Sequence, residues 1–399
     1  MSVDEVAVRL CDQNGRELAS SAVRTGQAGQ FGQWLTVPQA AGVNSDLLTE
    51  VTVKYLVGGQ VGWVRRALRF AVEPSFEARV EYESPARVGA GCRLAGTLVL
   101  ATRFHGYPFG ALEVRASGLP PAWSAEFAPL RQTETGQLSS SLVITCAERR
   151  ASSLHEVVSP ALQVSSGGQQ ILSHPLPRLM MSPDGLIQIA DARPKQATAL
   201  KGQPQVDGKL DDECWRRATP LTGFMPVGEP DFTERQTVAR LCWDDRCLYV
   251  AAQCFGRPKA EIRAEATKRD EPMPFDDVVE LLLRPSGSSR VYRIKVNPHG
   301  AAYDTACEVR GESIDWQGDV GWNAALTIAA MQREDGWQFE MAIPLADLGV
   351  MRIEEGGTCG LNLITARSVG PREVESWSHI ADWPPGHAAF GMLQFASGK

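Results

Sequence analysis

Hydrophobic and polar residues alternate along much of the chain with the period of two that is typical of β-strands. The alternation is clear at residues 6–11 and 48–57, so each stretch could bury one face of a sheet. An Asn-Gly pair at 14–15 and a Gly-Gly pair at 58–59 favour tight turns where such strands would reverse direction. Residues 1–74 are therefore predicted to form an immunoglobulin-like β-sandwich, which could be truncated at its first strands.

Residues 75–170 show the same pattern without repeating the first sequence, and they predict a second immunoglobulin-like β-sandwich. The following stretch contains many Ser, Gly, Gln and Pro residues, so residues 171–197 are predicted to be a linker. The strand candidates of the second sandwich, separated by Gly, Pro and Ser clusters, lie at residues 78–82, 92–101, 111–116 and 138–146.

From residue 198 onward, charged residues become dense between the strand candidates. The clearest alternation is at 337–343, where Trp, Phe, Met and Ile occupy one face and Gln338 and Glu340 the other. Residues 198–397 are predicted to form a third and larger β-sandwich. The predicted fold class is thus all-β, a tandem of β-sandwiches.

The composition narrows the range of partners. A chain of 399 residues is too long for one hydrophobic core, and its 43% apolar and 22% charged residues are typical of a folded protein. The formal charge of −7 comes without a basic stripe, so no nucleic acid partner is expected. No apolar run approaches the roughly 20 residues of a membrane span, so no membrane partner is expected.

The sequence contains none of the common catalytic or metal-binding motifs. The nine cysteines are scattered singly, which argues against a zinc site and a full disulfide framework, and Cys242 and Cys247 are interpreted as reduced strand residues. GxSxG, HExxH and CxxC patterns are missing, and the glycines at 89–96 lack the dinucleotide-binding spacing. His379 and His387 are interpreted as exposed loop residues. No catalytic and no metal-binding residue is assigned.

An ordered set of short motifs runs through the C-terminal region. They are VDGKLDDECW at 206–215, LCWDDRCLYVAAQC at 241–254, DDVVELLL at 276–283, YRIKVNPHG at 292–300, GWQFEMAIPLADLG at 336–349, GLNL at 360–363, SWS at 376–378 and FGMLQF at 390–395. In this order and spacing the set resembles the family 9 carbohydrate-binding module, of the DOMON-like superfamily. The resemblance covers about residues 201–395, implies a jelly-roll-type sandwich there, and does not extend to residues 1–200.

The resemblance implies a site in which two tryptophans grip a terminal sugar while charged side chains bind its hydroxyl groups. An aromatic face suits the C–H face of a pyranose, and charged groups form directional bonds with hydroxyls. Trp383 lies close to one sandwiching position, Glu280 matches the family's acid, and Lys295 stands where the family has arginine. Pro274 occupies the position of the other tryptophan, so Phe275 beside it is the candidate for the second aromatic face.

Other aromatic and acidic residues of the motifs are expected to have structural roles. The aspartate pairs at 211–212, 244–245 and 276–277 are interpreted as helix-cap and turn residues. Calcium, which is known in the family, is the alternative for these acids, although no EF-hand spacing is present. Core packing is expected for the tryptophans in motifs shared by the fold, Trp215, Trp243, Trp337 and Trp377.

Non-catalytic carbohydrate binding is the function that the resemblance implies, as an accessory to polysaccharide degradation by a linked or partner glycoside hydrolase. Two alternatives stay open. One is a structural or surface-display protein with a degenerate sugar site. The other is a DOMON-type haem-binding redox module, with Met273 near Lys295, or Met331, as an iron ligand. No signal peptide is visible at the start, whereas the family is usually secreted, so a truncated secreted protein and a cytoplasmic protein are both compatible with the sequence.

Overall fold

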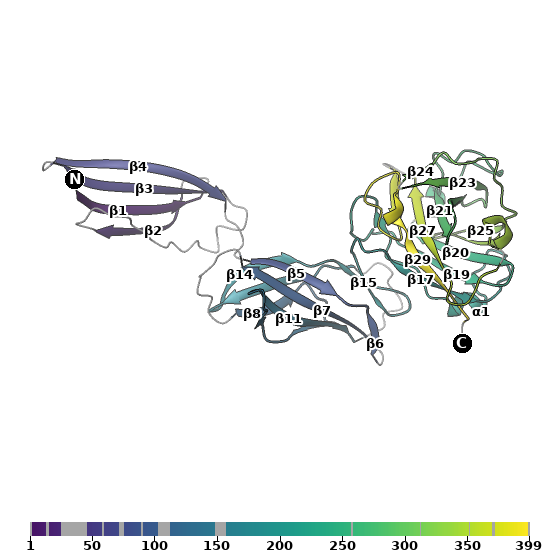
Figure 1. Ribbon diagram of the computed structural model, residues 1–399, viewed down its shortest axis with the longest axis horizontal. Helices are drawn as coiled ribbons and strands as arrows, with labels where there is room; N and C mark the ends of the chain where they lie inside the picture. Colours follow the sequence, from purple (N-terminus) through teal and green to yellow (C-terminus); the bar gives the residue numbers. More distant parts are fainter. Residues whose placement is uncertain are drawn as a thin grey trace.

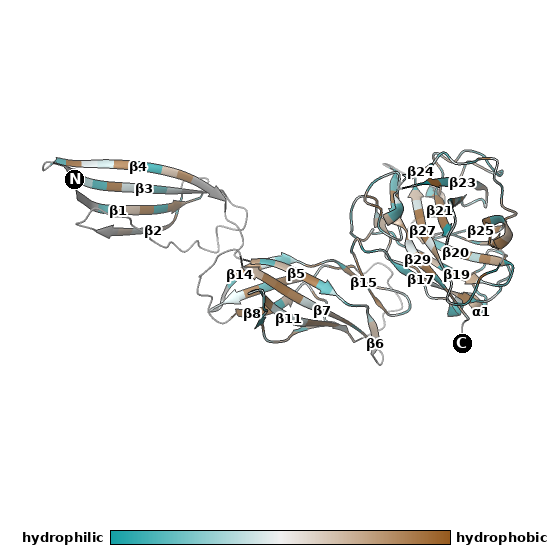
Figure 2. Cartoon of the chain, viewed as in Figure 1, coloured by the Kyte–Doolittle hydropathy of each residue, from teal (hydrophilic) through white to brown (hydrophobic). Residues whose placement is uncertain are grey.

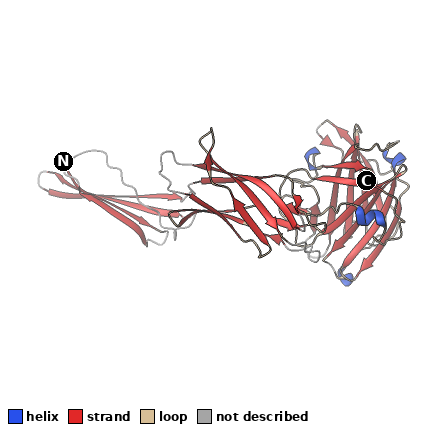
Figure 3. Cartoon of the chain, turned by 90° about the horizontal axis from the view of Figure 1, so that it is seen from below, coloured by secondary structure: helices blue, strands red, loops and turns tan. Residues whose placement is uncertain are grey.

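The computed structural model describes residues 2–12, 16–24, 46–57, 60–71, 76–88, 91–102, 112–147, 157–256, 258–311, 313–350, 352–368 and 372–397. Nearly all regular structure in these residues is β-strand, grouped into three successive units along the chain (Figures 1 and 3). The predicted all-β class with tandem β-sandwiches is confirmed. The helical segments in the described ranges are the α-helix α1 (Glu213–Arg217) and the 3-10 turns η2 (Lys259–Glu261), η3 (Leu345–Leu348) and η4 (His387–Ala389).

The first unit is an antiparallel sheet with the strand order β2–β1–β3–β4. Hydrophilic and hydrophobic positions alternate along β3 and β4 (Figure 2). β1 pairs with β2 and β3 pairs with β4, as the predicted turns require, although the turn residues lie outside the described ranges. The described residues of this unit form one layer. Its strands are β1 (Ser2–Cys11), β2 (Glu17–Arg24), β3 (Asp46–Val57) and β4 (Gln60–Ala71).

The second unit is a sandwich with its core between two sheets. Leu98 and Leu100 of one sheet pack against Leu162 and Val164 of the other, and all four are fully buried. One sheet contains β5 (Phe76–Tyr82), β6 (Ala86–Val88), β7 (Gly91–Thr102), β9 (Trp123–Phe127), β10 (Arg131–Gln132) and β11 (Leu138–Cys146). The other contains β8 (Leu112–Ser117), β13 (Ala161–Ser166) and β14 (Gln169–Pro175).

The segment expected as a linker, residues 171–197, is instead part of the folded structure. It includes most of β14 and the strands β15 (Leu179–Met181) and β16 (Ile187–Ile189), which join β12 (Val157–Val158) in a small sheet. Met180 packs with Met225 and Phe232 of the third unit. The Ser and Pro residues that suggested a linker here separate short strands whose buried apolar residues supply the stability.

The third unit is a curled sheet that folds over its own core. Leu241, Val250 and Phe339 of one half pack against Leu281 and Leu361 of the other. The sheet order is β24–β23–β22–β21–β27–β29–β17–β19–β20–β26–β25. The strands are β17 (Gln196–Lys201), β18 (Met225–Pro226), β19 (Thr237–Trp243), β20 (Cys247–Phe255), β21 (Val278–Pro285), β22 (Arg290–Val296), β23 (Ala302–Arg310), β24 (Ser313–Ile314), β25 (Thr327–Arg333), β26 (Gly336–Pro344), β27 (Thr358–Arg367), β28 (Glu373–Ser376) and β29 (Gly391–Ala396).

The polar face of β26 is covered as completely as its apolar face. Glu340 is fully buried, and it accepts hydrogen bonds from Trp215 Nε1 at 2.6 Å, Gly208 N at 2.7 Å and Asp207 N at 3.0 Å. Burial raises the pKa of Glu340 above its ordinary value, while these three donors oppose the shift. One carboxylate therefore attaches the turn at Asp207 and Gly208, together with α1, to the sheet. The alternation in the sequence placed Glu340 on the polar face of this strand, but it did not indicate that the turn at Asp207 and α1 would pack over that face.

Replacing Glu340 by alanine should lower the free energy of unfolding of this domain by about 3 kcal/mol, because three buried N–H donors lose their acceptor. Urea denaturation of the full chain, followed by tryptophan fluorescence, measures the change. Glu308→Ala is the matched control, since Glu308 forms an exposed ion pair with Arg310 and should cost less than about 1 kcal/mol. Equal losses in the two variants would contradict the anchoring role of Glu340.

Lys195, where the chain enters the third unit, gives a second test of the packing. Its ammonium donates to the carbonyls of Thr222 and Gly223, and burial lowers the pKa of Lys195 to about 7. Between pH 7 and pH 10 the unfolded chain therefore binds a proton that the folded protein lacks, so stability attributable to this group rises with pH.

Relative to Lys195→Met, the wild type should gain about 3 kcal/mol of unfolding free energy from pH 7 to pH 10. Denaturation at several pH values measures the difference between the two proteins. The exposed Lys259→Met variant should run parallel to the wild type. A wild-type advantage over Lys195→Met that is constant with pH would contradict the lowered pKa.

Candidate binding site

Glu280 and Lys295 meet on the outer face of the sheet formed by β21, β22 and β27. The two residues stand directly opposite each other in the antiparallel register of β21 and β22. Glu280 is only 4% exposed, and its Oε2 lies 3.9 Å from Lys295 Nζ. Arg293, two residues before Lys295 and on the same face, places both Nε and Nη2 at 2.7 Å from Glu280 Oε1. The structure thus forms a charged cluster of Glu280, Arg293 and Lys295.

Lys295 is a partly exposed cation at the edge of this charged cluster. Its side chain is 26% exposed, and Nζ lies 5.8 Å from the centre of the Tyr303 ring. Burial is the main cause that lowers the pKa of Lys295; the charges of Arg293 and Arg372 add to it, and Glu280 opposes it. Because Nζ is beyond hydrogen-bond distance of Glu280, both groups retain capacity for a ligand's hydroxyls.

Trp316 connects the charged cluster to the loop that carries Trp383. The guanidinium of Arg293 lies 5.4 Å from the centre of the Trp316 ring and donates to the Trp316 carbonyl at 2.8 Å. Trp316 Nε1 in turn donates to the carbonyl of Pro385 at 3.0 Å. Trp383, two residues before Pro385, is 53% exposed. An exposed indole therefore lies on a loop that is held to the charged cluster through one tryptophan.

The loop is fixed to the sheet at both ends by Asn362. The buried amide of Asn362 donates to the carbonyls of Ser378 at 2.8 Å and Ala389 at 2.7 Å. Its oxygen accepts from Ser378 N at 3.0 Å. The residues between, 379–388, therefore leave and rejoin the sheet at defined points, which restricts where Trp383 can stand.

Phe275 lies on the segment that enters β21, and it is 63% exposed. Arg372 donates from Nη1 to the carbonyl of Pro274, and the charge of Arg372 also acts on Lys295. Arg372 thus bonds to the residue before Phe275 and acts by its charge on Lys295. Trp316 instead bonds to both Arg293 and the loop that carries Trp383. Glu280 and Lys295 interact directly, and the two aromatic candidates remain separate exposed groups.

The aspartates after Phe275 join distant loops, whereas the sequence predicted a local helix-cap or turn role for them. Asp276 accepts from Glu265 N at 2.9 Å, Ala266 N at 3.2 Å and Asn297 Nδ2 at 2.7 Å. Asp277 accepts from Arg263 N at 3.2 Å and Ser368 N at 2.9 Å. In the described part of the chain, no group of three or more His, Cys, Asp or Glu side chains could hold a metal ion.

Several residues of the site were not identified from sequence. Arg293 could have been found, because a strand residue two positions from Lys295 must share its face. Tyr303 could also have been found, because it stands directly opposite Lys295 on the next strand of the hairpin. Trp316 and Arg372 had no comparable signal, since their positions depend on loops. The four tryptophans expected in the core are all buried, Trp215, Trp243, Trp337 and Trp377.

Other candidates from the sequence are placed as follows. Met273 is buried in an apolar cluster with Ala266 and Val278, and Met331 is partly exposed on β25. The expectation that His379 and His387 are exposed is wrong: both are partly buried, and His387 Nδ1 lies 2.8 Å from Arg284 Nη1. Sequence gave no sign that the loop folds back onto β21. None of the helical segments in the described ranges has the length and apolar character of a membrane span.

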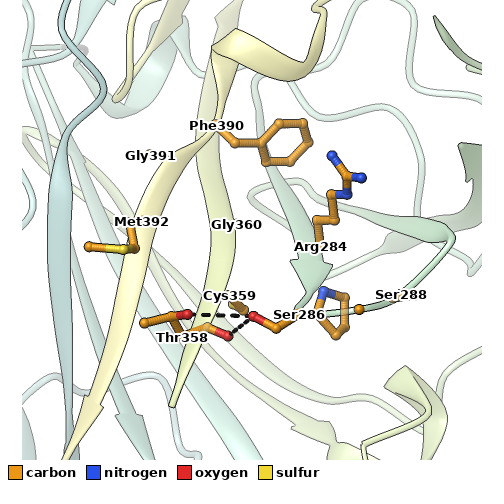
Figure 4. A pocket seen from close by; sticks show the side chains of 11 residues that line it. Arg284, Ser286, Ser288, Thr358, Cys359, Gly360, Phe390, Gly391 and Met392 are labelled. Carbon is orange, nitrogen blue, oxygen red and sulfur yellow. Dashed lines mark hydrogen bonds between the residues drawn. The ribbon is translucent and has the colours of Figure 1, made fainter. Parts of the chain in front are cut away.

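Two cavities among the described residues of this domain are lined by residues other than Trp383, Glu280, Lys295 and Phe275. One is an open groove of about 560 Å³ beside Arg284 (Figure 4). The other, of about 300 Å³, is mostly apolar and lies at the end of the core near Leu283 and Phe395. The candidate site lies outside these two cavities, on a surface that carries the charged cluster and, on separate segments, the two exposed aromatic side chains.

Comparison with known proteins finds a resemblance in this domain. Residues 206–390 match the family model described as carbohydrate family 9 binding domain-like. A solved structure of a candidate carbohydrate-binding protein from Bacteroides uniformis ATCC 8492 is similar with a TM-score of 0.41 and 17% identity, covering 51% of this chain and 99% of that chain. No curated protein matches the chain. The resemblance to the carbohydrate family 9 binding domain is therefore found at residues 206–390, somewhat less than half of the chain.

Proposed function

We propose that the C-terminal domain binds a saccharide, without catalysis, on the face that carries Trp383, Glu280 and Lys295. The observation that supports this most directly is the exposed Trp383, on a loop that Trp316 joins to the cluster of the buried Glu280 with Arg293 and the partly exposed Lys295. The match of residues 206–390 to a carbohydrate-binding family model supports the same assignment.

The chemistry of this face suits a pyranose. The exposed indole of Trp383 offers an aromatic surface for the C–H face of a sugar ring. Glu280 Oε2 can accept from a hydroxyl group, and Lys295 Nζ can donate to one, since the two atoms are 3.9 Å apart. With one tryptophan and no enclosed pocket, we expect a dissociation constant on the order of 1 mM, about −4 kcal/mol.

The carboxylates near this face favour binding over hydrolysis. Glycoside hydrolysis uses two carboxyl groups, one as acid and one as base or nucleophile, about 5–10 Å apart. Here Glu280 is paired with Arg293 and Lys295, while Asp276 and Asp277 accept backbone N–H groups. Acids committed in this way support the domain structurally, so we infer that the domain is a binding accessory.

We further propose that the domain serves polysaccharide degradation by a linked or partner glycoside hydrolase. Tethering a weak binding domain to an enzyme raises the effective concentration of that enzyme at the polymer. The two preceding β-units would then act as spacers.

Trp383→Ala should weaken saccharide binding at least tenfold, because the stacking surface is removed. Isothermal titration of the full chain with glucose, galactose, xylose and their β-1,4-linked disaccharides, up to tens of millimolar, measures the affinity. Trp63→Ala is the matched control, since Trp63 is similarly exposed but lies on β4 of the first unit. Absence of binding by the wild type to every sugar, or unchanged binding by Trp383→Ala, would refute the proposal.

Substitutions at Lys295 and Arg293 should affect different quantities, saccharide affinity for Lys295 and the free energy of unfolding for Arg293. Lys295→Gln should weaken saccharide binding about tenfold while changing the free energy of unfolding by less than about 1 kcal/mol, because Lys295 is partly exposed. Arg293→Gln should destabilise the domain by about 3 kcal/mol, because it leaves Glu280 buried without its closest partner. Titration and urea denaturation of both variants measure the two effects. The same stability loss in both would show that Lys295 is structural.

A further inference from the structure

The groove beside Arg284 lies on the same sheet face as the candidate saccharide site. Arg284, Gly360 and Met392 stand in one row across β21, β27 and β29. Glu280 and Arg284 are four residues apart on one strand, which corresponds to about 13 Å. Between them the loop packs onto Leu282 and Ile364 through Ile380 and Ala389. The groove is thus separated from the Trp383 face by the loop.

Gly360 creates the groove by leaving the middle of this row without a side chain. A Cβ atom at Gly360 would lie 3.3 Å from Arg284 Cβ and 3.3 Å from Phe390 Cδ1. Figure 4 shows Phe390 beside the guanidinium of Arg284, with Met392 across the strand that carries Gly360. The resulting volume is about 560 Å³, which is in the range of small-molecule sites.

The guanidinium of Arg284 has N–H donors left for a ligand, and no ion pair among the described residues balances its positive charge. Nη1 donates to His387 Nδ1 at 2.8 Å, since a guanidinium can only donate. In the described residues no carboxylate lies within ion-pair distance of Arg284. Three other arginines of this domain contact a carboxylate, in the pairs Arg269–Asp304, Arg293–Glu280 and Arg367–Glu375, whereas the partly buried Arg240, like Arg284, has no such ion pair among the described residues. Arg284 therefore differs from those three in lacking an anion.

The rest of the lining defines what kind of anion would fit. Phe390 and Met392 are apolar walls, and Met392 is exposed. The hydroxyl groups of Ser286 and Thr358 lie at the opposite end of the groove from Phe390 (Figure 4). An arginine fork binds a planar carboxylate, an aromatic ring contacts a C–H face, and hydroxyl groups bind hydroxyl groups. One ligand combines these three features: a sugar ring that carries a carboxylate.

We propose that the groove is a second ligand site of this domain, specific for a hexuronic acid residue whose carboxylate binds Arg284. The sugar ring lies against Phe390, and its hydroxyl groups face Ser286 and Thr358. This inference is independent of the proposed saccharide site, because the two sites share no residue.

The test is titration of the full chain with D-glucuronate, D-glucose and acetate at constant ionic strength, by isothermal calorimetry or ligand-observed NMR. Wild type and Trp383→Ala should bind glucuronate equally, and Arg284→Gln should bind it at least tenfold more weakly. Arg284→Lys, which keeps the charge but loses the fork, should also bind more weakly. Arg290→Gln, an exposed arginine on the neighbouring strand, is the control and should match the wild type. Circular dichroism and thermal melting verify that each variant is folded.

Three results would overturn the inference. Glucuronate binding that survives Arg284→Gln would place the ligand elsewhere. Loss in Trp383→Ala but not in Arg284→Gln would assign glucuronate to the first site, and would leave the proposed saccharide function intact. Acetate binding as tightly as glucuronate would reduce the groove to a simple anion site.

Discussion

The register of β21 against β22 and β27 is the constraint on which the function of this domain depends. Side chains alternate between the faces of a sheet, so a slip of one residue would exchange the two faces. In the observed register Leu281 and Leu283 point into the core, while Glu280 and Arg284 point outward. The hydrophobic core thereby determines which polar side chains meet. Both the charged cluster and the Arg284 groove follow from it.

The free-energy cost of burying Glu280 is offset because the pairing of β21 with β22 places Arg293 next to it. Removing a carboxylate from water costs several kcal/mol, and the Coulomb gain repays this only with good geometry. Arg293 provides that geometry through two nitrogens on one oxygen, and Trp316 covers its guanidinium. The remaining oxygen, Oε2, is left toward Lys295. A site built on strands in this way is more rigid than one built on loops.

The sequence predicted the features that depend on local pattern. It did not predict those that depend on which distant segment packs over a given face of the sheet. Strand alternation and hairpin turns predicted the all-β fold, and the ordered motifs predicted the family resemblance that the family model finds at residues 206–390. The partnership of Glu280 and Lys295 follows from strand pairing. The expected linker at 171–197 was wrong, because Pro and Ser residues there punctuate short buried strands. Trp316 was missed because only the fold brings its loop to Arg293.

The loop between Ser378 and Ala389 is attached to the sheet at several points along its length. Its two ends bind one buried amide, that of Asn362, so that both are fixed by the same residue. Between these ends, the Pro385 carbonyl accepts from Trp316 on one side, and His387 accepts from Arg284 on the other. Loops with few buried contacts open at little free-energy cost, whereas this one has contacts at each end and in its middle. The loop therefore separates two parts of one sheet face. The position of Trp383 depends on the hydrogen bonds that Asn362 makes to both ends of the loop as well as on the loop residues themselves.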